Sequence, residues 1–258
     1  MKKRQNISIY PLLIIVIFLV FTSSCEKDDE NKPTNGQTTA VFNTNVSYGT
    51  MTDQDGNVYK TVTIGTQTWM AENLRTTTYN DGTSIPNITD KDEWAVLTKG
   101  GYCNYNNATS TDTIATYGRL YNWYAVNTGK LAPEGWHVPT DGEWKELEMY
   151  LGMSQSEADD TGYRGTDEGG KLKETGTTHW NSPNTGATNA SGFTAVPGGY
   201  RYGGNGSFRS IGNAGAWWSA TERTASYAWY RGMGFIDGTV GRNGSGKQDG
   251  ISVRCLRY

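Results

Sequence analysis

Histidine and cysteine, the side chains most often used for transition-metal binding and nucleophilic chemistry, are scarce in this 258-residue chain. It has two histidines, His137 and His179, and three cysteines. The histidines belong to no His-x-x-x-His pair and to no cysteine cluster, so the spacing of a zinc site is absent. Each lies next to a tryptophan, where packing and hydrogen bonding account for it better than catalysis does. We therefore predict no metal and no cofactor.

A surplus of positive charge is also missing. The chain has 23 Lys and Arg against 26 Asp and Glu, and a formal net charge of −3. Without Lys2, Lys3 and Arg4 at its start, the net charge becomes −6. Because nucleic-acid recognition usually shows a basic footprint, this balance argues against a nucleic-acid partner. The sequence also lacks a Gly-x-Ser-x-Gly nucleophile elbow and a phosphate-binding glycine loop, so it indicates no common hydrolase or nucleotide site.

The apolar run at residues 7–21 is shorter than the roughly 20 residues that span a bilayer as a helix. It follows three basic residues and ends at small residues before Cys25, an order typical of a secretory signal. The cysteine resembles the acylated first residue of a mature bacterial lipoprotein. We predict a signal peptide over residues 1–24 and lipidation of Cys25, which would anchor the protein to the outer membrane. A single transmembrane span is the weaker alternative.

Residues 26–30 are almost all acidic, and in Bacteroidetes-type bacteria such a stretch after the lipidated cysteine resembles a surface-export signal. A plain solvated linker explains it equally well. Residues 25–46 contain few large apolar side chains, so we predict a flexible tether there and a domain over residues 47–258. In an oxidising compartment Cys103 and Cys255 could form a disulfide; two buried free thiols are the alternative.

The domain composition favours a loop-rich β or α+β fold, because the chain has 33 Gly, 16 Tyr and 9 Trp and few long helical periods. Asp55-Gly56 is a tight-turn dipeptide followed by alternating apolar residues, which predicts a hairpin. The only strong helix signal runs over residues 140–151. Thr140 and Glu143 form a capping box, and Trp144 and Leu147 begin an apolar face that should pack on a sheet. A shorter helix near residues 156–160 is weakly patterned.

The C-terminal third reads as short strands among glycine loops, at residues 207–208, 216–220, 227–235 and 251–256. In an extended segment the adjacent Trp217 and Trp218 must point to opposite faces. One of them can fill the core while the other faces a second layer or a ligand groove.

Several segments in order resemble the Fibrobacter succinogenes major paralogous domain, a family of surface and secreted proteins. They are residues 53–62, 64–74, 117–123, 133–141, 218–222 and 252–257. The resemblance implies an α+β, C-type lectin-like fold with one main helix on small twisted antiparallel sheets. Many relatives have a cysteine where this chain has Ala132. If that cysteine pairs with the equivalent of Cys255, the bridge is lost here.

The lectin-like fold is shared with formylglycine-generating enzymes, which work through paired cysteines, but Cys103 and Cys255 do not match that pattern. The carboxylate and amide cluster of calcium-dependent lectins is absent too. We therefore expect non-catalytic binding of a glycan or a surface protein through the loops of residues 176–250. The candidate contact residues are Trp180, Tyr200, Tyr202, Trp217, Trp218, Glu222 and Trp229. The alternatives are a polysaccharide-acting enzyme using Glu222 and Asp237, or a structural envelope component.

Overall fold

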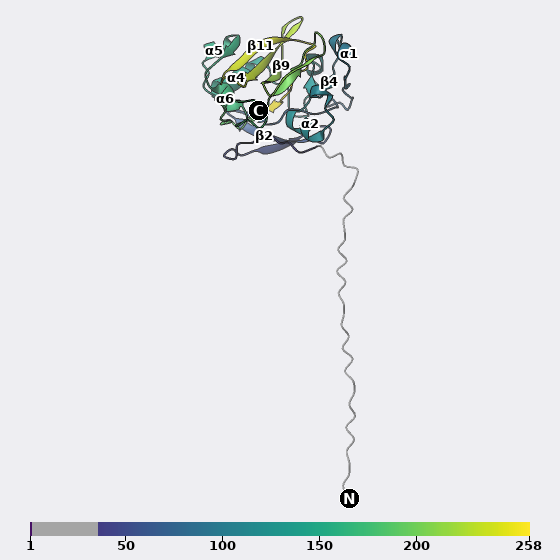
Figure 1. Ribbon diagram of the computed structural model, residues 1–258, viewed down its shortest axis with the longest axis vertical. Helices are drawn as coiled ribbons and strands as arrows, with labels where there is room; N and C mark the ends of the chain where they lie inside the picture. Colours follow the sequence, from purple (N-terminus) through teal and green to yellow (C-terminus); the bar gives the residue numbers. More distant parts are fainter. Residues whose placement is uncertain (2–35) are drawn as a thin grey trace. The chain divides into compact units, whose positions relative to one another are not determined.

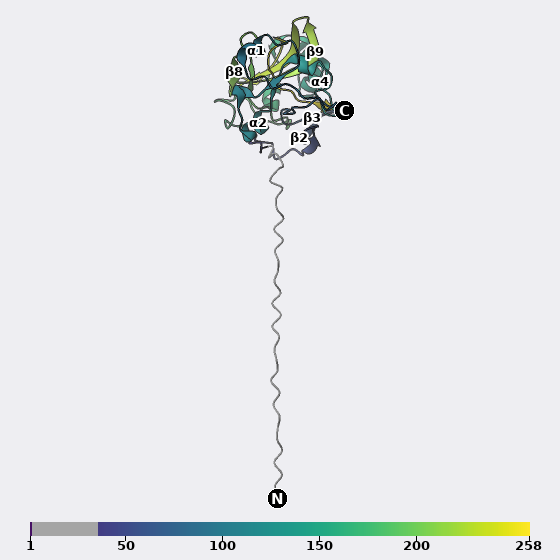
Figure 2. The ribbon, with the colours of Figure 1, turned by 90° about the vertical axis from the view of Figure 1, so that its right-hand side faces the viewer.

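The computed structural model describes Met1 and residues 36–258 (Figure 1). Apart from Met1, the predicted signal peptide lies outside the described residues. So do Cys25 and the rest of the predicted tether up to residue 35. Among the helices in the described part of the chain, none is both long and apolar enough to cross a bilayer. Residues 36–258 form an α+β domain in which short helices surround sheets that are antiparallel except for the pairing of β7 with β9 (Figures 1 and 2).

The first sheet has the strand order β1-β2-β3-β12, with β1 Gly49–Thr52, β2 Val58–Ile64, β3 Gln67–Met70 and β12 Leu256–Arg257. The β1–β2 hairpin confirms the prediction from Asp55-Gly56: Gly56 has φ +80°, which suits a residue without a Cβ, and a Cβ there would meet nothing. Asp53 stabilises the turn, because its carboxylate accepts from both the backbone and the side chain of Asn57. The C-terminal strand closes this sheet by pairing with β3.

The second sheet has six strands in the order β6-β11-β10-β9-β7-β8. Their bounds are β6 Gly162–Arg164, β7 Gly198–Arg201, β8 Phe208–Ile211, β9 Ala214–Thr224, β10 Tyr227–Gly234 and β11 Val240–Gly246. The predicted strands at 216–220 and 227–235 are confirmed, although β9 is longer than expected. The predicted strand at 251–256 is mostly isolated bridges that lead into β12. A small third sheet pairs β4 Tyr102–Cys103 with β5 Leu120–Tyr121.

Helix α4, Asp141–Tyr150, confirms the main predicted helix, and both halves of the Thr140–Glu143 capping box are present. The weakly patterned helix is also present, as α5 Gln155–Asp159. The sequence patterns missed four others, each of seven residues or fewer: α1 Lys91–Ala95, α2 Thr111–Tyr117, α3 Trp123–Val126 and α6 Glu168–Leu172. Such lengths are too short to show an apolar period, so side-chain caps such as Asp90 and Ser110 are their main local signal. A 3₁₀ turn, η1 Tyr105–Asn107, precedes α2.

Trp217 and Trp218 of β9 point to opposite faces of the six-stranded sheet, as predicted. Trp217 belongs to the core under α4, with Trp69, Trp144 and Leu147. Trp218 belongs to a second core on the other face. The rings of Trp69 and Trp144 lie 4.7 Å apart, so α4 packs on the sheets through the face that its sequence predicts.

The predicted boundary between tether and domain is too late in the sequence, because residues 36–46 are hydrogen-bonded to the domain. The amide of Gln37 donates to Asp112 at 2.9 Å, and that of Val41 donates to the buried Glu174. Phe42 also packs against the core under α4. Polar composition predicted a free linker here, but the partners of these backbone groups come from residues far along the chain.

The possible disulfide is also corrected: Cys103 and Cys255 are both free and buried. They lie in different hydrophobic clusters, Cys103 with Trp94 and Leu120, and Cys255 in the core on the Trp218 face. Burial raises the pKa of the Cys103 thiol to about 12 and also raises that of Cys255. Both are therefore inert packing residues at neutral pH. Ala132 lies in the same cluster as Cys255.

Candidate functional site

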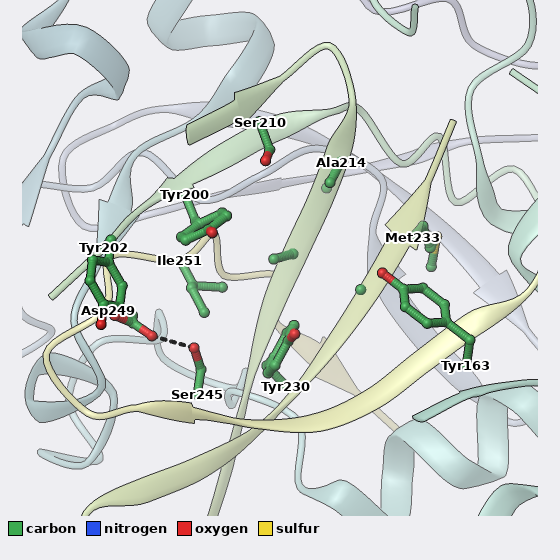
Figure 3. Close-up of a pocket in the computed structure, with 13 residues that line it drawn as sticks. Tyr163, Tyr200, Tyr202, Ser210, Ala214, Tyr230, Met233, Ser245, Asp249 and Ile251 are labelled. Atoms are coloured by element: carbon green, nitrogen blue, oxygen red, sulfur yellow. Dashed lines mark hydrogen bonds between the residues drawn. The ribbon is translucent and has the colours of Figure 1, made fainter. Parts of the chain in front are cut away.

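A groove of about 380 Å³ lies on the Trp218 face of the six-stranded sheet (Figure 3). Four tyrosines form much of its wall: Tyr163 of β6, Tyr200 of β7, Tyr202 just after β7, and Tyr230 of β10. Ser210 of β8 also lines it. Since β6 and β8 are the two edges of this sheet, their side chains reach one hollow only because the sheet curls.

The groove is hollow because its floor carries small residues. β9 contributes Ala214 and Ala216, and β10 contributes Gly232, which pairs directly with Ala216. The backbone of Gly232 is not in the left-handed region, so its conformation does not require glycine. A Cβ on Gly232 would meet one neighbour, the Tyr230 ring, at 3.3 Å. The hollow is therefore a consequence of side-chain size at this position.

The tyrosine hydroxyls in the groove are available to a ligand. Within the described part of the chain, the hydroxyls of Tyr163, Tyr200 and Tyr230 have no hydrogen-bond partner, and Figure 3 shows their rings around the hollow. Burial raises the pKa of Tyr230 to about 12 and also raises that of Tyr163. These two phenols therefore stay neutral at physiological pH. A tyrosine hydroxyl can donate one hydrogen bond and accept others.

Asp249 supplies the negative charge of the groove. It is buried, and it accepts from the backbone N–H of Gly203 at 2.7 Å and from the hydroxyl of Ser245, the one hydrogen bond drawn in Figure 3. Burial raises the pKa of this carboxyl. Those hydrogen bonds fix the carboxylate just after β11, where it lines both the groove and a neighbouring hollow.

That neighbouring hollow, of about 390 Å³, shares Tyr202, Ser245 and Asp249 with the groove. Its other walls are largely glycines and the exposed Tyr227. The two hollows together make an elongated surface, with aromatic rings along it and one carboxylate at the junction. Such a surface suits a ligand longer than a single small ring.

Two of the predicted contact residues, Tyr200 and Tyr202, lie together in the groove. Three others are corrected, because Trp180, Trp217 and Trp218 are at most 1% exposed. The indole N–H of each is already bonded inside the protein, to Ala195 O, Asn73 Oδ1 and Tyr121 O respectively, at 2.8–2.9 Å. A tryptophan whose ring and polar edge are both satisfied internally has no surface left for a ligand.

Trp229 and Glu222 lie near the surface but outside the groove. Trp229 alternates with Tyr230 and so faces the other side of the sheet, stacked between Arg223 at 4.6 Å and Arg242 at 4.0 Å. Glu222 is exposed and pairs with Lys247 at 2.7 Å.

The structure does not bring together the two carboxylates of the enzyme alternative. Glu222 pairs in register with Ala228, and Asp237 follows the far end of β10 at Gly234. At about 3.3 Å per residue, roughly 20 Å separates Ala228, the partner of Glu222, from Gly234 along β10. Glycosidase carboxylates lie about 5–9.5 Å apart, so this pair cannot act together.

Both histidines have structural partners. His137 lies 2.7 Å from Glu143 of the capping box. His179 is half-buried: Nδ1 lies 2.9 Å from Glu174, and Nε2 lies 2.9 Å from the Thr39 hydroxyl. His179 therefore helps to hold the segment of residues 36–46 on the domain. Over Met1 and residues 36–258, no group of three or more His, Cys, Asp or Glu side chains is arranged to hold a metal ion.

Sequence reasoning missed Tyr163, Tyr230 and Asp249. A signal existed for Tyr230, because it shares a strand face with Gly232 and Gly234 and so stands beside empty space. Nothing local marks Tyr163 or Asp249. Tyr163 belongs to a three-residue edge strand, and Asp249 to a turn whose partners come from residues 203–245.

Comparison with known proteins gives one family. No curated protein and no solved structure matches the chain significantly. The sequence model of the Fibrobacter succinogenes major domain (Fib_succ_major) matches residues 62–257, which include the whole six-stranded sheet, strands β3 and β12 of the first sheet, and the groove. Since this match covers most of the sequence, the chain belongs to the Fibrobacter succinogenes major domain family.

Proposed function

We propose that the domain is a non-catalytic binding module that recognises a neutral oligosaccharide in the tyrosine groove. The observation that carries the proposal is the set of tyrosines with free hydroxyls around a hollow built on Ala214, Ala216 and Gly232. Its volume lies near the lower end of the roughly 300–1,000 Å³ of ordinary ligand sites.

The chemistry of the groove fits a sugar. A tyrosine ring can cover the apolar C–H face of a pyranose, while phenol and carboxylate groups bond to the sugar hydroxyls. Asp249 can accept hydrogen bonds but is a single charge, and no cation lines the groove among the described residues. A neutral, hydroxyl-rich ligand satisfies both the rings and the carboxylate. The adjoining hollow favours an oligosaccharide over a monosaccharide.

Filling the groove should weaken this binding. Gly232→Val places a branched side chain on the floor, and we expect affinity for the bound glycan to fall about tenfold or more, or about 1.4 kcal/mol for each tenfold. The mature chain would first be screened on an array of neutral oligosaccharides, including cello-, xylo- and manno-oligosaccharides. The hit would then be measured by isothermal titration calorimetry.

Gly234→Val is the matched control, because Gly234 lies two residues along the same strand face, outside the groove, where a Cβ meets nothing. It should bind like the wild type. Equal binding by wild type and Gly232→Val would remove the groove from the proposal. Binding to no neutral glycan would contradict the proposed function, and release of free sugar would favour the enzyme alternative.

We also propose that the protein is a surface-facing lipoprotein of the outer membrane, anchored at Cys25. The support is the sequence pattern of residues 1–30. Mass spectrometry of the protein from its native membrane should find a mature N-terminus at Cys25 carrying fatty acids. A product that begins elsewhere, or that is not acylated at Cys25, would contradict this.

We further propose that the domain has a C-type lectin-like fold. In its support, one main helix, α4, packs on twisted antiparallel sheets, and long irregular loops connect them.

A further inference from the structure

A separate hollow, of about 340 Å³, is lined by residues of β4 and α2 and shares no lining residue with the tyrosine groove. Its lining comes from four segments and combines polar side chains with Tyr102 of β4, Ala108, and Ile114 of α2. Asn87 and Thr89 precede α1, Asn104 and Asn107 flank or belong to η1, and Arg119 precedes β5. The hollow therefore forms only when these loops fold together.

Arg119 is held in a fixed orientation at this hollow. Its Nε donates to Arg75 O at 2.8 Å, one Nη donates to Asn104 Oδ1, and the guanidinium lies 4.7 Å from the centre of the Tyr102 ring. The other Nη has no hydrogen-bond partner, and no carboxylate pairs with Arg119 within the range that the structure covers, residues 36–258 and Met1. A half-buried guanidinium whose position is fixed and whose charge is unpaired is a ready anion ligand.

The remaining lining residues add neutral donors and no competing negative charge. Asn104 and Asn107 each use one amide N–H on a loop carbonyl, Ala108 O and Thr89 O. The Asn87 side chain has no hydrogen-bond partner among residues 36–258. The carboxylates near the hollow are engaged elsewhere, since Asp55 accepts from Thr77, Asp90 caps α1 and Asp112 accepts from Gln37. One positive charge among amides and hydroxyls matches a single negative charge on a polar molecule.

We propose that this hollow binds the carboxylate of an acidic sugar, such as a uronic acid, with Arg119 pairing with the carboxylate and the surrounding amides and hydroxyls bonding to the ring hydroxyls. A single guanidinium balances a carboxylate, whereas a phosphate dianion would leave uncompensated charge in the hollow. The hollow is much larger than a carboxylate alone, and its wall carries both polar side chains and the apolar surfaces of Tyr102, Ala108 and Ile114. Such a mixed wall suits a carboxylate carried on a sugar ring, which has hydroxyls and an apolar C–H face. The site is independent of the neutral-glycan groove.

The test measures binding of D-glucuronate and D-galacturonate to the mature chain by calorimetry or NMR titration. Glucose and inorganic phosphate serve as neutral and dianionic probes. Asn87→Asp places a carboxylate in the lining at an exposed position whose side chain makes no bond, so the fold should be retained. We expect uronate binding to weaken about tenfold or more, because like charges then face each other.

Asn45→Asp is the matched control, since it makes the same charge change at an exposed residue outside this hollow. It should bind uronate like the wild type, as should Gly232→Val in the separate groove. Arg119→Lys keeps the charge but loses the planar fork, and it should also weaken binding. The proposal is overturned if neither uronate binds, if phosphate binds more tightly than uronate, or if Asn87→Asp binds as well as Asn45→Asp.

Discussion

Replacing Arg231 with methionine is expected to lower the free energy of unfolding by about 3–5 kcal/mol. Arg231 is fully buried, with Nε 2.6 Å from Glu148 and an Nη 2.8 Å from Asp141. Arg164 and Arg242 pair with the outer sides of the same two carboxylates. Arg231 is thus the centre of a buried chain of alternating charges that ties α4 to β10 and β11.

The cost arises from the carboxylates that remain. Burial already raises the pKa of Glu148 despite its two arginine partners, so losing one of them leaves a poorly compensated charge in the core. Chemical denaturation with urea at neutral pH would measure the change. Arg223→Met is the control: Arg223 is exposed and covers one face of Trp229, and its replacement should cost less than about 1 kcal/mol. Equal stabilities for the two variants would contradict the role of the buried network.

Truncating Trp217 or Trp218 to alanine should destabilise the fold by a similar amount, about 3–5 kcal/mol each. The two residues are neighbours in sequence but fill separate cores on the two faces of β9. Each truncation leaves a large cavity and also removes an internal hydrogen bond, to Asn73 Oδ1 from Trp217 and to Tyr121 O from Trp218. Thermal or urea unfolding of the single variants would measure the losses.

Trp229→Ala provides the comparison, because Trp229 is only half-buried and lies between two arginines on the surface of the sheet. Trp229→Ala should lower the free energy of unfolding clearly less than Trp217→Ala does. If Trp217→Ala kept full stability but lost glycan binding, Trp217 would be a contact residue, and its buried position would be wrong. The same reasoning applies to Trp218.

Several parts of the fold could be predicted because their signals are local. Asp55-Gly56 specifies its turn through backbone conformation, and Thr140 with Glu143 specifies the start of α4 through reciprocal caps. The alternation of side chains along β9 likewise separates Trp217 from Trp218. Short helices such as α3, and edge strands such as β6, have too few residues to show a period.

The candidate site was only partly predictable. Tyr200 and Tyr202 were found because they stand in a glycine- and aromatic-rich segment, whereas Tyr163 and Asp249 come from strand and turn positions that look ordinary in sequence. Trp180 was misassigned as exposed because a tryptophan in a polar loop looks the same whether it faces water or the core. The hydrogen bond from its indole N–H to Ala195 O shows that the ring is turned toward the core, and no local sequence pattern indicates that contact.

The sequence by itself determined the family, through motifs spread along the chain. It also determined the Asp55-Gly56 turn, the start of α4 and the alternation of faces along β9, because each of these depends on residues within a few positions of one another. Only the tertiary structure decided which face became core and which became groove. That outcome depends on the curl of a six-stranded sheet, which brings Tyr163 to Tyr200 and leaves Gly232 uncovered between them. The hollow exists because small side chains on the paired strands β9 and β10 are surrounded by tyrosines from β6, β7 and β10.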